Sequence, residues 1–150
     1  MSDIIDIKIN GLGKKRIRIN GDDNKIILLN TNDNNIVIRY NEIYPKLKEL
    51  EGDFKELNAI DIKDDDIDGL NAYAIKAKDI DTKMRESLDF IFNSEVAEIC
   101  SDGGSMYDIL DGGTMRWEAI LTGLIGLYTD TVNKNAEQAK KLKELTSKYN

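Results

Sequence analysis

The sequence predicts an α+β protein with a single domain over residues 1–150: an N-terminal antiparallel sheet of two β-hairpins, then a helical C-terminal part ending in a long amphipathic helix. Three observations predict this class. Apolar and polar residues alternate through much of residues 1–40, and apolar residues recur every three or four positions afterwards. A chain of 150 residues with 41% apolar and 33% charged residues also has the balance of one globular domain.

Residues 1–40 contain four short apolar runs. Ile5, Ile7 and Ile9 alternate with polar residues, and the run RIRI repeats this alternation at Ile17 and Ile19. The runs KIILL and IVIRY follow, preceded by the segments NGDDN and TNDNN. These segments are typical of turns, because Asn and Gly tolerate positive φ and short polar side chains bind nearby backbone amides. We therefore expect four strands, paired as two hairpins.

A first helix is predicted over residues 41–57, because its apolar residues share one helical face. That face contains Ile43, Leu47, Leu50, Phe54 and Leu57. Pro45, the only proline, fits the first turn of this helix, where its missing N–H is not needed. Residues 58–69 are rich in aspartate and lack periodicity, which predicts an exposed acidic connector.

Residues 79–150 are predicted to form the helical part. Its first helix is marked by Ile80, Met84, Leu88 and Ile91. From Thr114 onwards one apolar seam continues almost to the end of the chain; it comprises Trp117, Leu121, Leu124, Tyr128, Val132, Ala136, Ala139, Leu142, Leu145 and Tyr149. A helix of about 35 residues is roughly 50 Å long and extends beyond a domain of this size. Its second half is apolar only on a narrow stripe, so we expect that half to pack on a partner or to fray alone.

The stretch DIKDDDIDGL, residues 61–70, resembles the beginning of a calcium-binding loop. Asp64, Asp66, Asp68 and Gly69 match its first, third, fifth and sixth positions. The twelfth position is Ile75, where the loop requires a bidentate glutamate. We therefore interpret the stretch as a solvated connector and predict no metal site.

The composition excludes several kinds of catalytic site. Cys100 is the only cysteine and the chain has no histidine, so an intramolecular disulfide, a Cys/His zinc site and a histidine-activated nucleophile are excluded. The Asp-Gly-Gly units at 102–104 and 111–113 are typical of turns, because neither follows a predicted strand nor precedes a Lys-Ser or Lys-Thr pair. We predict no catalytic residue and no cofactor.

Charge is distributed unevenly along the chain. Residues 1–20 and 133–150 each carry a net charge of +3, whereas residues 41–120 carry −11. This pattern disfavours direct contact with nucleic acid and favours a basic protein partner or self-association. The chain has no apolar run of about 18 residues and no leader-like N-terminus. We expect a cytoplasmic protein without membrane contact.

Four segments together resemble a known family. The run NKIILLNTNDNNIVIRYNEIYPKLKEL is followed by RESLDFIFNSEVAEIC, by SMYDILDGG and by the terminal amphipathic helix. This order resembles small phage and prophage proteins of Gram-positive hosts that are encoded among tail-morphogenesis genes and described as tail assembly chaperones. The resemblance covers about Lys25 to Tyr128. It implies a non-enzymatic role in the host bacterial cytoplasm, in which the protein binds the tape-measure protein or the tube subunit during tail assembly.

The second half of the terminal helix is the candidate partner interface. It comprises Ala136, Ala139, Leu142, Leu145 and Tyr149, with Lys140 and Lys141 beside them. The same stripe could instead pack within a homo-oligomer or dock on its own chain. Two other functions stay open: an acidic phage-encoded inhibitor that blocks a host nucleic-acid-binding protein, and a structural tail subunit.

Overall fold

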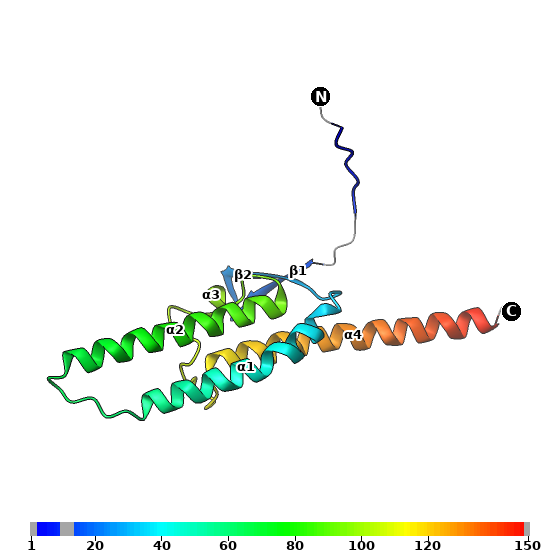
Figure 1. The fold of residues 1–150 in the computed structure, drawn as a ribbon. Helices are drawn as coiled ribbons and strands as arrows, with labels where there is room; N and C mark the ends of the chain where they lie inside the picture. The colour runs from blue at the N-terminus through cyan, green and yellow to red at the C-terminus, as the bar shows by residue number, and fades with distance from the viewer. Residues whose placement is uncertain (1–2, 10–13, 149–150) are drawn as a thin grey trace.

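A two-stranded antiparallel hairpin and four helices make up the part of the chain that the computed structural model describes, residues 3–9 and 14–148 (Figure 1). The elements are β1 (Lys14–Ile19), β2 (Asp22–Asn30), α1 (Asn35–Asn58), α2 (Ile67–Phe92), α3 (Ala97–Cys100) and α4 (Arg116–Lys148). Helices α1 and α2 form a long antiparallel pair, and α4 lies along α1 before it extends beyond the other elements (Figure 1). The α+β class is therefore confirmed.

The hairpin closes on the two-residue turn Asn20-Gly21. Both residues have positive φ, 53° and 72°, which is the backbone geometry of a type I′ turn. Ile17 on β1 pairs with Ile27 on β2. Ile27 and Leu29 are fully buried, so the inner face of the hairpin contributes to the core.

The prediction of a second hairpin is wrong, because Ile5–Ile9 does not form a strand. Residues 3–9 are extended and exposed and run away from the body (Figure 1). Strand β1 pairs with β2 instead, and its Ile17 and Ile19 pack against the core, whereas Ile5, Ile7 and Ile9 are 71–89% exposed.

The predicted strand IVIRY is also wrong, since residues 36–40 form the beginning of α1. Asp33 starts the helix: its carboxylate accepts a hydrogen bond from the N–H of Asn35, and its carbonyl accepts one from the N–H of Ile36. Ile36 is then fully buried. Because α1 begins earlier than predicted, Pro45 lies inside the helix rather than in its first turn.

Helix α2 is also longer than predicted and begins at Ile67 instead of near residue 79. The side chain of Asp66 caps it by accepting a hydrogen bond from the N–H of Gly69 at 2.8 Å. The acidic connector is therefore shorter than the predicted 58–69 and consists of residues 59–66.

The predicted helical faces supply most of the core. Leu47, Leu50 and Leu57 of α1 are buried, and Ile43 and Phe54 pack against them while partly buried. The four marked residues of α2 and the first four seam residues of α4 are buried as well: Ile80, Met84, Leu88, Ile91, Trp117, Leu121, Leu124 and Tyr128. These face assignments are confirmed.

Candidate functional site

The distal half of α4 is the candidate interaction surface, and it projects beyond the other elements (Figure 1). Ala136, Ala139, Leu142 and Leu145 are all exposed, and the two leucines keep 66% and 52% of their surface open to solvent. Tyr149 lies outside the described residues. The structure therefore leaves the described part of the predicted stripe uncovered, and its role as an interface stays a prediction.

The exposed stripe continues a buried seam. Tyr128 is 6% exposed, whereas Val132, one turn later, is 40% exposed. Asn135 still reaches the body, because its side-chain amide donates to the side-chain oxygen of Asn32 at 3.4 Å. Beyond this point the helix presents apolar residues in the same register without support from the core. We call residues 132–145 of this seam the α4 stripe.

Three lysines flank the α4 stripe. Lys140, Lys141 and Lys143 are exposed. At 3.6 residues per turn, Lys143 lies about 70° from the centre of the stripe, and Lys140 and Lys141 lie about 130° from it on either side. A partner segment would therefore meet apolar contacts flanked by positive charge.

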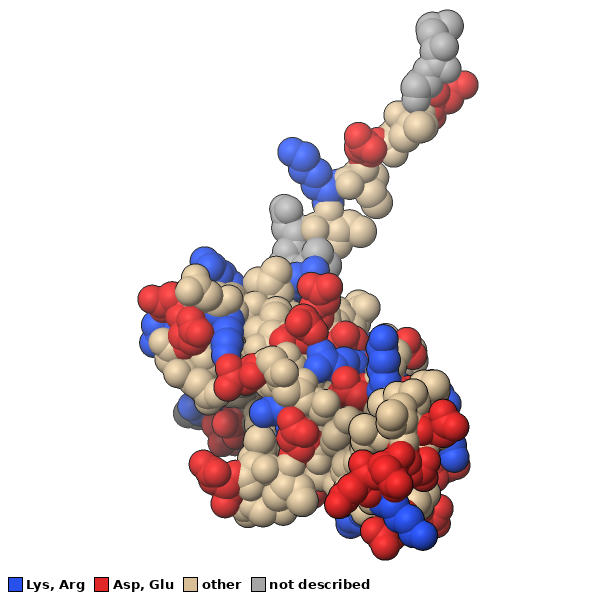
Figure 2. Space-filling view, turned by 90° about the vertical axis from the view of Figure 1, so that its left-hand side faces the viewer, with Lys and Arg blue, Asp and Glu red and all other residues tan. Residues whose placement is uncertain are grey.

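The opposite end of the molecule, where α1 turns into α2, is acidic. Residues 59–68 contain five aspartates and one lysine. Figure 2 looks towards this end, and acidic side chains gather on its near surface. The aspartates alternate with exposed apolar side chains of 55–71% exposure: Ile60, Ile67, Leu70 and Ile75. We call residues 59–75 the α1–α2 tip.

A groove of about 380 Å³ follows the two helices behind this tip. Its apolar residues are Leu57, Ile75 and Ile80, and its charged residues are Asp53, Asp79 and Lys76. The sequence reasoning missed this surface because it left residues 70–78 outside a helix. Asp66 followed three residues later by Gly69, before the alanine-rich run NAYAIKAK, is the signal that could have placed the start of α2 correctly.

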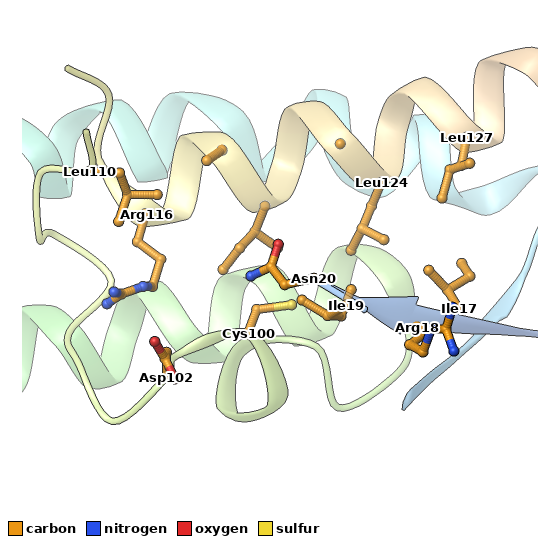
Figure 3. Close-up of a pocket in the computed structure, with 13 residues that line it drawn as sticks. Ile17, Arg18, Ile19, Asn20, Cys100, Asp102, Leu110, Arg116, Leu124 and Leu127 are labelled. Carbon is orange, nitrogen blue, oxygen red and sulfur yellow. The ribbon is translucent and has the colours of Figure 1, made fainter. Parts of the chain in front are cut away.

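A second groove, of about 470 Å³, lies between β1 and α4 (Figure 3). Ile17, Ile19 and Leu124 form apolar walls, and a Cβ added at Gly123 would meet no atom within 4 Å. Cys100 also lines this groove and is half-buried. Burial raises the pKa of its thiol, which keeps it protonated and unreactive at neutral pH. The groove offers apolar contact rather than a nucleophile.

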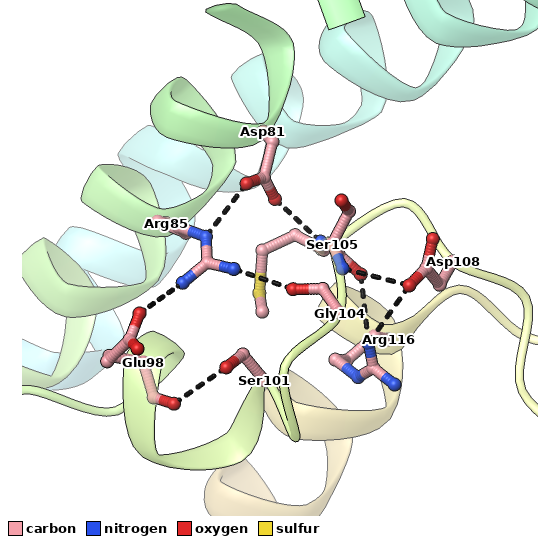
Figure 4. Close-up of polar contacts among 9 residues, drawn as sticks. Asp81, Arg85, Glu98, Ser101, Gly104, Ser105, Asp108 and Arg116 are labelled. Atoms are coloured by element: carbon pink, nitrogen blue, oxygen red, sulfur yellow. Dashed lines mark hydrogen bonds and ion pairs between the residues drawn. The ribbon is translucent and has the colours of Figure 1, made fainter. Parts of the chain in front are cut away.

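A polar network joins α2, α3 and the loop before α4 (Figure 4). Arg85 donates from Nε to Asp81 at 2.9 Å, from one terminal nitrogen to Glu98 at 2.6 Å, and from the other to the carbonyl of Gly104 at 2.7 Å. The second carboxylate oxygen of Asp81 accepts the N–H of Met106 at 2.7 Å. Each of these groups is therefore occupied in holding the loop to α2.

The neighbouring Asp108 has a similar structural role. Its carboxylate accepts the N–H of Ser105 at 2.8 Å and a hydrogen bond from Arg116 at 3.2 Å. Arg116 also donates to the carbonyl of Ser105 at 3.1 Å. The network thus fixes the loop that leads into α4, and it brings these carboxylates to arginine and backbone donors rather than to one another.

The stretch that resembles a calcium loop has a different use in the structure. Asp66 caps α2, and Gly69 lies so close to the Asp66 carboxylate that a Cβ at this position would overlap it. Among residues 3–9 and 14–148, no group of three or more acidic or cysteine side chains is placed to hold a metal ion.

Comparison of the chain with protein-family models, with curated proteins and with solved structures gave no match. Within the described residues, no helix has the length and apolar character needed to cross a bilayer. The function is therefore argued from the surfaces described above.

Proposed function

We propose that the protein is a non-enzymatic phage tail assembly chaperone that binds the tape-measure or tube protein in the host bacterial cytoplasm. The observation that carries this proposal is the uncovered α4 stripe. Leu142 and Leu145 lie on a helix that projects from a core already complete without them. Exposed apolar residues in helical register are typical of a surface that binds a second helix.

The geometry of the stripe suits a long helical client. Residues 132–148 span roughly 25 Å at the helical rise of 1.5 Å per residue. The exposed lysines around the stripe, Lys140, Lys141 and Lys143, favour a client with acidic residues beside its own apolar seam. A tape-measure protein, with its long apolar-striped helices, is such a client, and its shielding before tube polymerisation is the task we assign to this stripe.

Co-expression with the tail proteins encoded beside this chain, followed by affinity capture, tests the proposal. The double variant Leu142→Lys/Leu145→Lys should lose capture of the tape-measure or tube protein. The control Glu137→Gln/Glu144→Gln changes the net charge by the same two units on the opposite helical face and should retain capture. Thermal unfolding followed by the fluorescence of Trp117 should show an unchanged core in both variants.

Two outcomes would contradict the proposal. The first is undiminished capture by the leucine double variant. The second is recovery of the protein in stoichiometric amount from finished tails, which would indicate a structural subunit instead.

A further inference from the structure

Among the residues that the structure describes, two exposed surfaces of opposite charge lie at opposite ends of the molecule. The α1–α2 tip projects from one end of the body, and the distal half of α4 projects from the other (Figure 1). Five aspartates and one lysine give residues 59–68 a net charge of −4, whereas residues 133–150 carry +3. Opposite charges of this size attract and orient two surfaces as they approach.

Both ends also expose apolar side chains. On the tip, Ile67 and Ile75 are 70% and 71% exposed. The groove behind it adds apolar contact through Leu57, Ile75 and Ile80, whereas its Asp53 and Asp79 are balanced by Lys76 and by Lys83, which pairs with Asp79, so the negative charge of this end lies in residues 59–68. On α4, Leu142 and Leu145 are similarly open. Each end therefore combines apolar contacts with the charge that the other end lacks.

The dimensions of the two surfaces match. The distal half of α4 from residue 132 is roughly 25 Å long, and the part of α2 from residue 67 to 80 is roughly 21 Å long, at 1.5 Å per residue. Because tip and tail lie at opposite ends of an elongated body, a two-fold axis across that body places the tail of each copy beside the tip of the other. One isologous interface then covers both surfaces twice.

We propose that two copies of this chain pair antiparallel, with the α4 stripe of each copy seated on the α1–α2 tip and groove of the other. The occupant is a second copy because each surface supplies the apolar contact and the opposite charge that the other needs. This dimer is a property of the isolated protein and does not depend on the chaperone role. If that role holds, the client helix and the second copy compete for one stripe.

Charge reversal tests the arrangement directly. The wild-type protein should sediment as a dimer whose dissociation constant rises with salt concentration. A tail variant, Lys140→Glu/Lys143→Glu, and a tip variant, Asp61→Lys/Asp64→Lys, should each weaken self-association by about tenfold or more, which corresponds to about 1.4 kcal/mol. The tip variant leaves Asp66 in place so that the cap of α2 is kept.

Mixing the two variants gives the decisive measurement. The tail variant changes the net charge of residues 133–150 from +3 to −1, and the tip variant changes that of residues 59–68 from −4 to 0. A heterodimer of the two variants places the −1 tail on the neutral tip on one side and a wild-type tail on a wild-type tip on the other, so it restores one complete pair and avoids the repulsion between a −1 tail and a −4 tip. The mixture should therefore dimerise more tightly than either variant does alone. Glu137→Gln/Glu144→Gln is the control, and it should dimerise at least as tightly as the wild type, because it leaves every lysine of the tail in place.

Three results would overturn the proposal: a monomeric wild-type protein, a mixture that dimerises no more tightly than the separate variants, or a tip variant that dimerises as tightly as the wild type. The last would show that the tails pair with each other. Capture of a tail protein by the tip variant separates this proposal from the chaperone role. If the tip variant dimerises more weakly but still captures a tail protein, the dimer and the chaperone role are both supported. If the wild type dimerises but captures no tail protein, only the chaperone role is rejected.

Discussion

Arg39 on α1 donates from Nε to the carbonyl oxygen of Ile91 near the end of α2, at 2.9 Å. The same guanidinium binds the Asp33 carboxylate at 2.6 Å, and both side chains are more than four-fifths buried. One arginine therefore ties the start of α1 to the last turn of α2. This contact also helps to explain why residues 36–40 are helical, since Arg39 reaches Asp33 and Ile91 from a helical position.

We expect Asp33→Asn to lower the free energy of unfolding by about 1–3 kcal/mol at neutral pH, because Arg39 loses its ionic partner in a mostly buried site. Burial raises the pKa of the Asp33 carboxyl, but hydrogen bonds from Arg39 and the N–H of Asn35 lower it by more, so this pKa lies below its ordinary value of 3.8. A depressed pKa contributes stability above the ordinary value, and that stability is lost as pH falls through the folded-state pKa.

The difference between wild type and Asp33→Asn should consequently be full near pH 6 and should shrink below about pH 4. Urea unfolding at a series of pH values measures it. Asp23→Asn is the matched control, because Asp23 pairs with Arg18 on the surface and keeps 86% of its side chain exposed. A difference that persists undiminished at the lowest pH would contradict the assignment.

Gly104→Ala should destabilise the protein by about 1–3 kcal/mol. A Cβ at this position would overlap the Arg116 guanidinium and the Asp108 carboxylate, which are bound to each other and cannot both move aside without losing that contact. Gly112→Ala is the control, because a Cβ there meets nothing within 4 Å, and it should change stability by less than about 0.5 kcal/mol. Equal effects of the two substitutions in chemical denaturation would refute this role of Gly104.

Asp66→Ala should cost about 0.5–2 kcal/mol, since it removes the cap of α2. Asp65→Ala, one residue earlier, removes an exposed carboxylate outside the helix cap, which Asp66 forms, and should have little effect. Millimolar calcium should leave the melting temperature of the wild type unchanged. A calcium-dependent rise that disappears in Asp66→Ala would restore the metal interpretation.

Truncation of leucines should separate the core from the α4 stripe. Leu88→Ala should lower the free energy of unfolding by about 2–5 kcal/mol, because Leu88 is fully buried in α2. Leu142→Ala should change it by less than about 0.5 kcal/mol when measured on the monomer. Trp117 fluorescence reports both transitions. A large loss at Leu142 in the monomer would mean that the distal half of α4 packs on its own chain.

The helical faces could be read from the sequence because periodicity reports burial directly. Leu47, Leu50 and Leu57 share one face at the helical spacing, and the structure buries all three. Residues 36–40 misled the same reasoning, since their β-branched Ile and Val favour strands by composition. The contacts that favour a helix at these residues are made by Asp33 and, across the fold, by Ile91.

Only one of the two candidate surfaces could be predicted from the sequence. The α4 stripe follows from spacing along a single helix, whereas the α1–α2 tip depends on where α2 begins and on which helix covers it. The polar network could not be predicted from the sequence either, because its contacts depend on how the chain folds. Arg85 meets Glu98 and Gly104, which are 13 and 19 residues away, only after the chain has folded back on α2.

Pro45 lies inside α1, where it has no N–H to offer the carbonyl of Asn41 one turn earlier. The backbone hydrogen bonding of α1 is therefore interrupted at this position. In hydrogen–deuterium exchange, the amides of residues 39–44 should exchange together, at a rate set by the breaking of the Arg39 contacts. The amides after residue 48 should exchange with the α1–α2 pair and, if the antiparallel dimer forms, become slower with rising protein concentration.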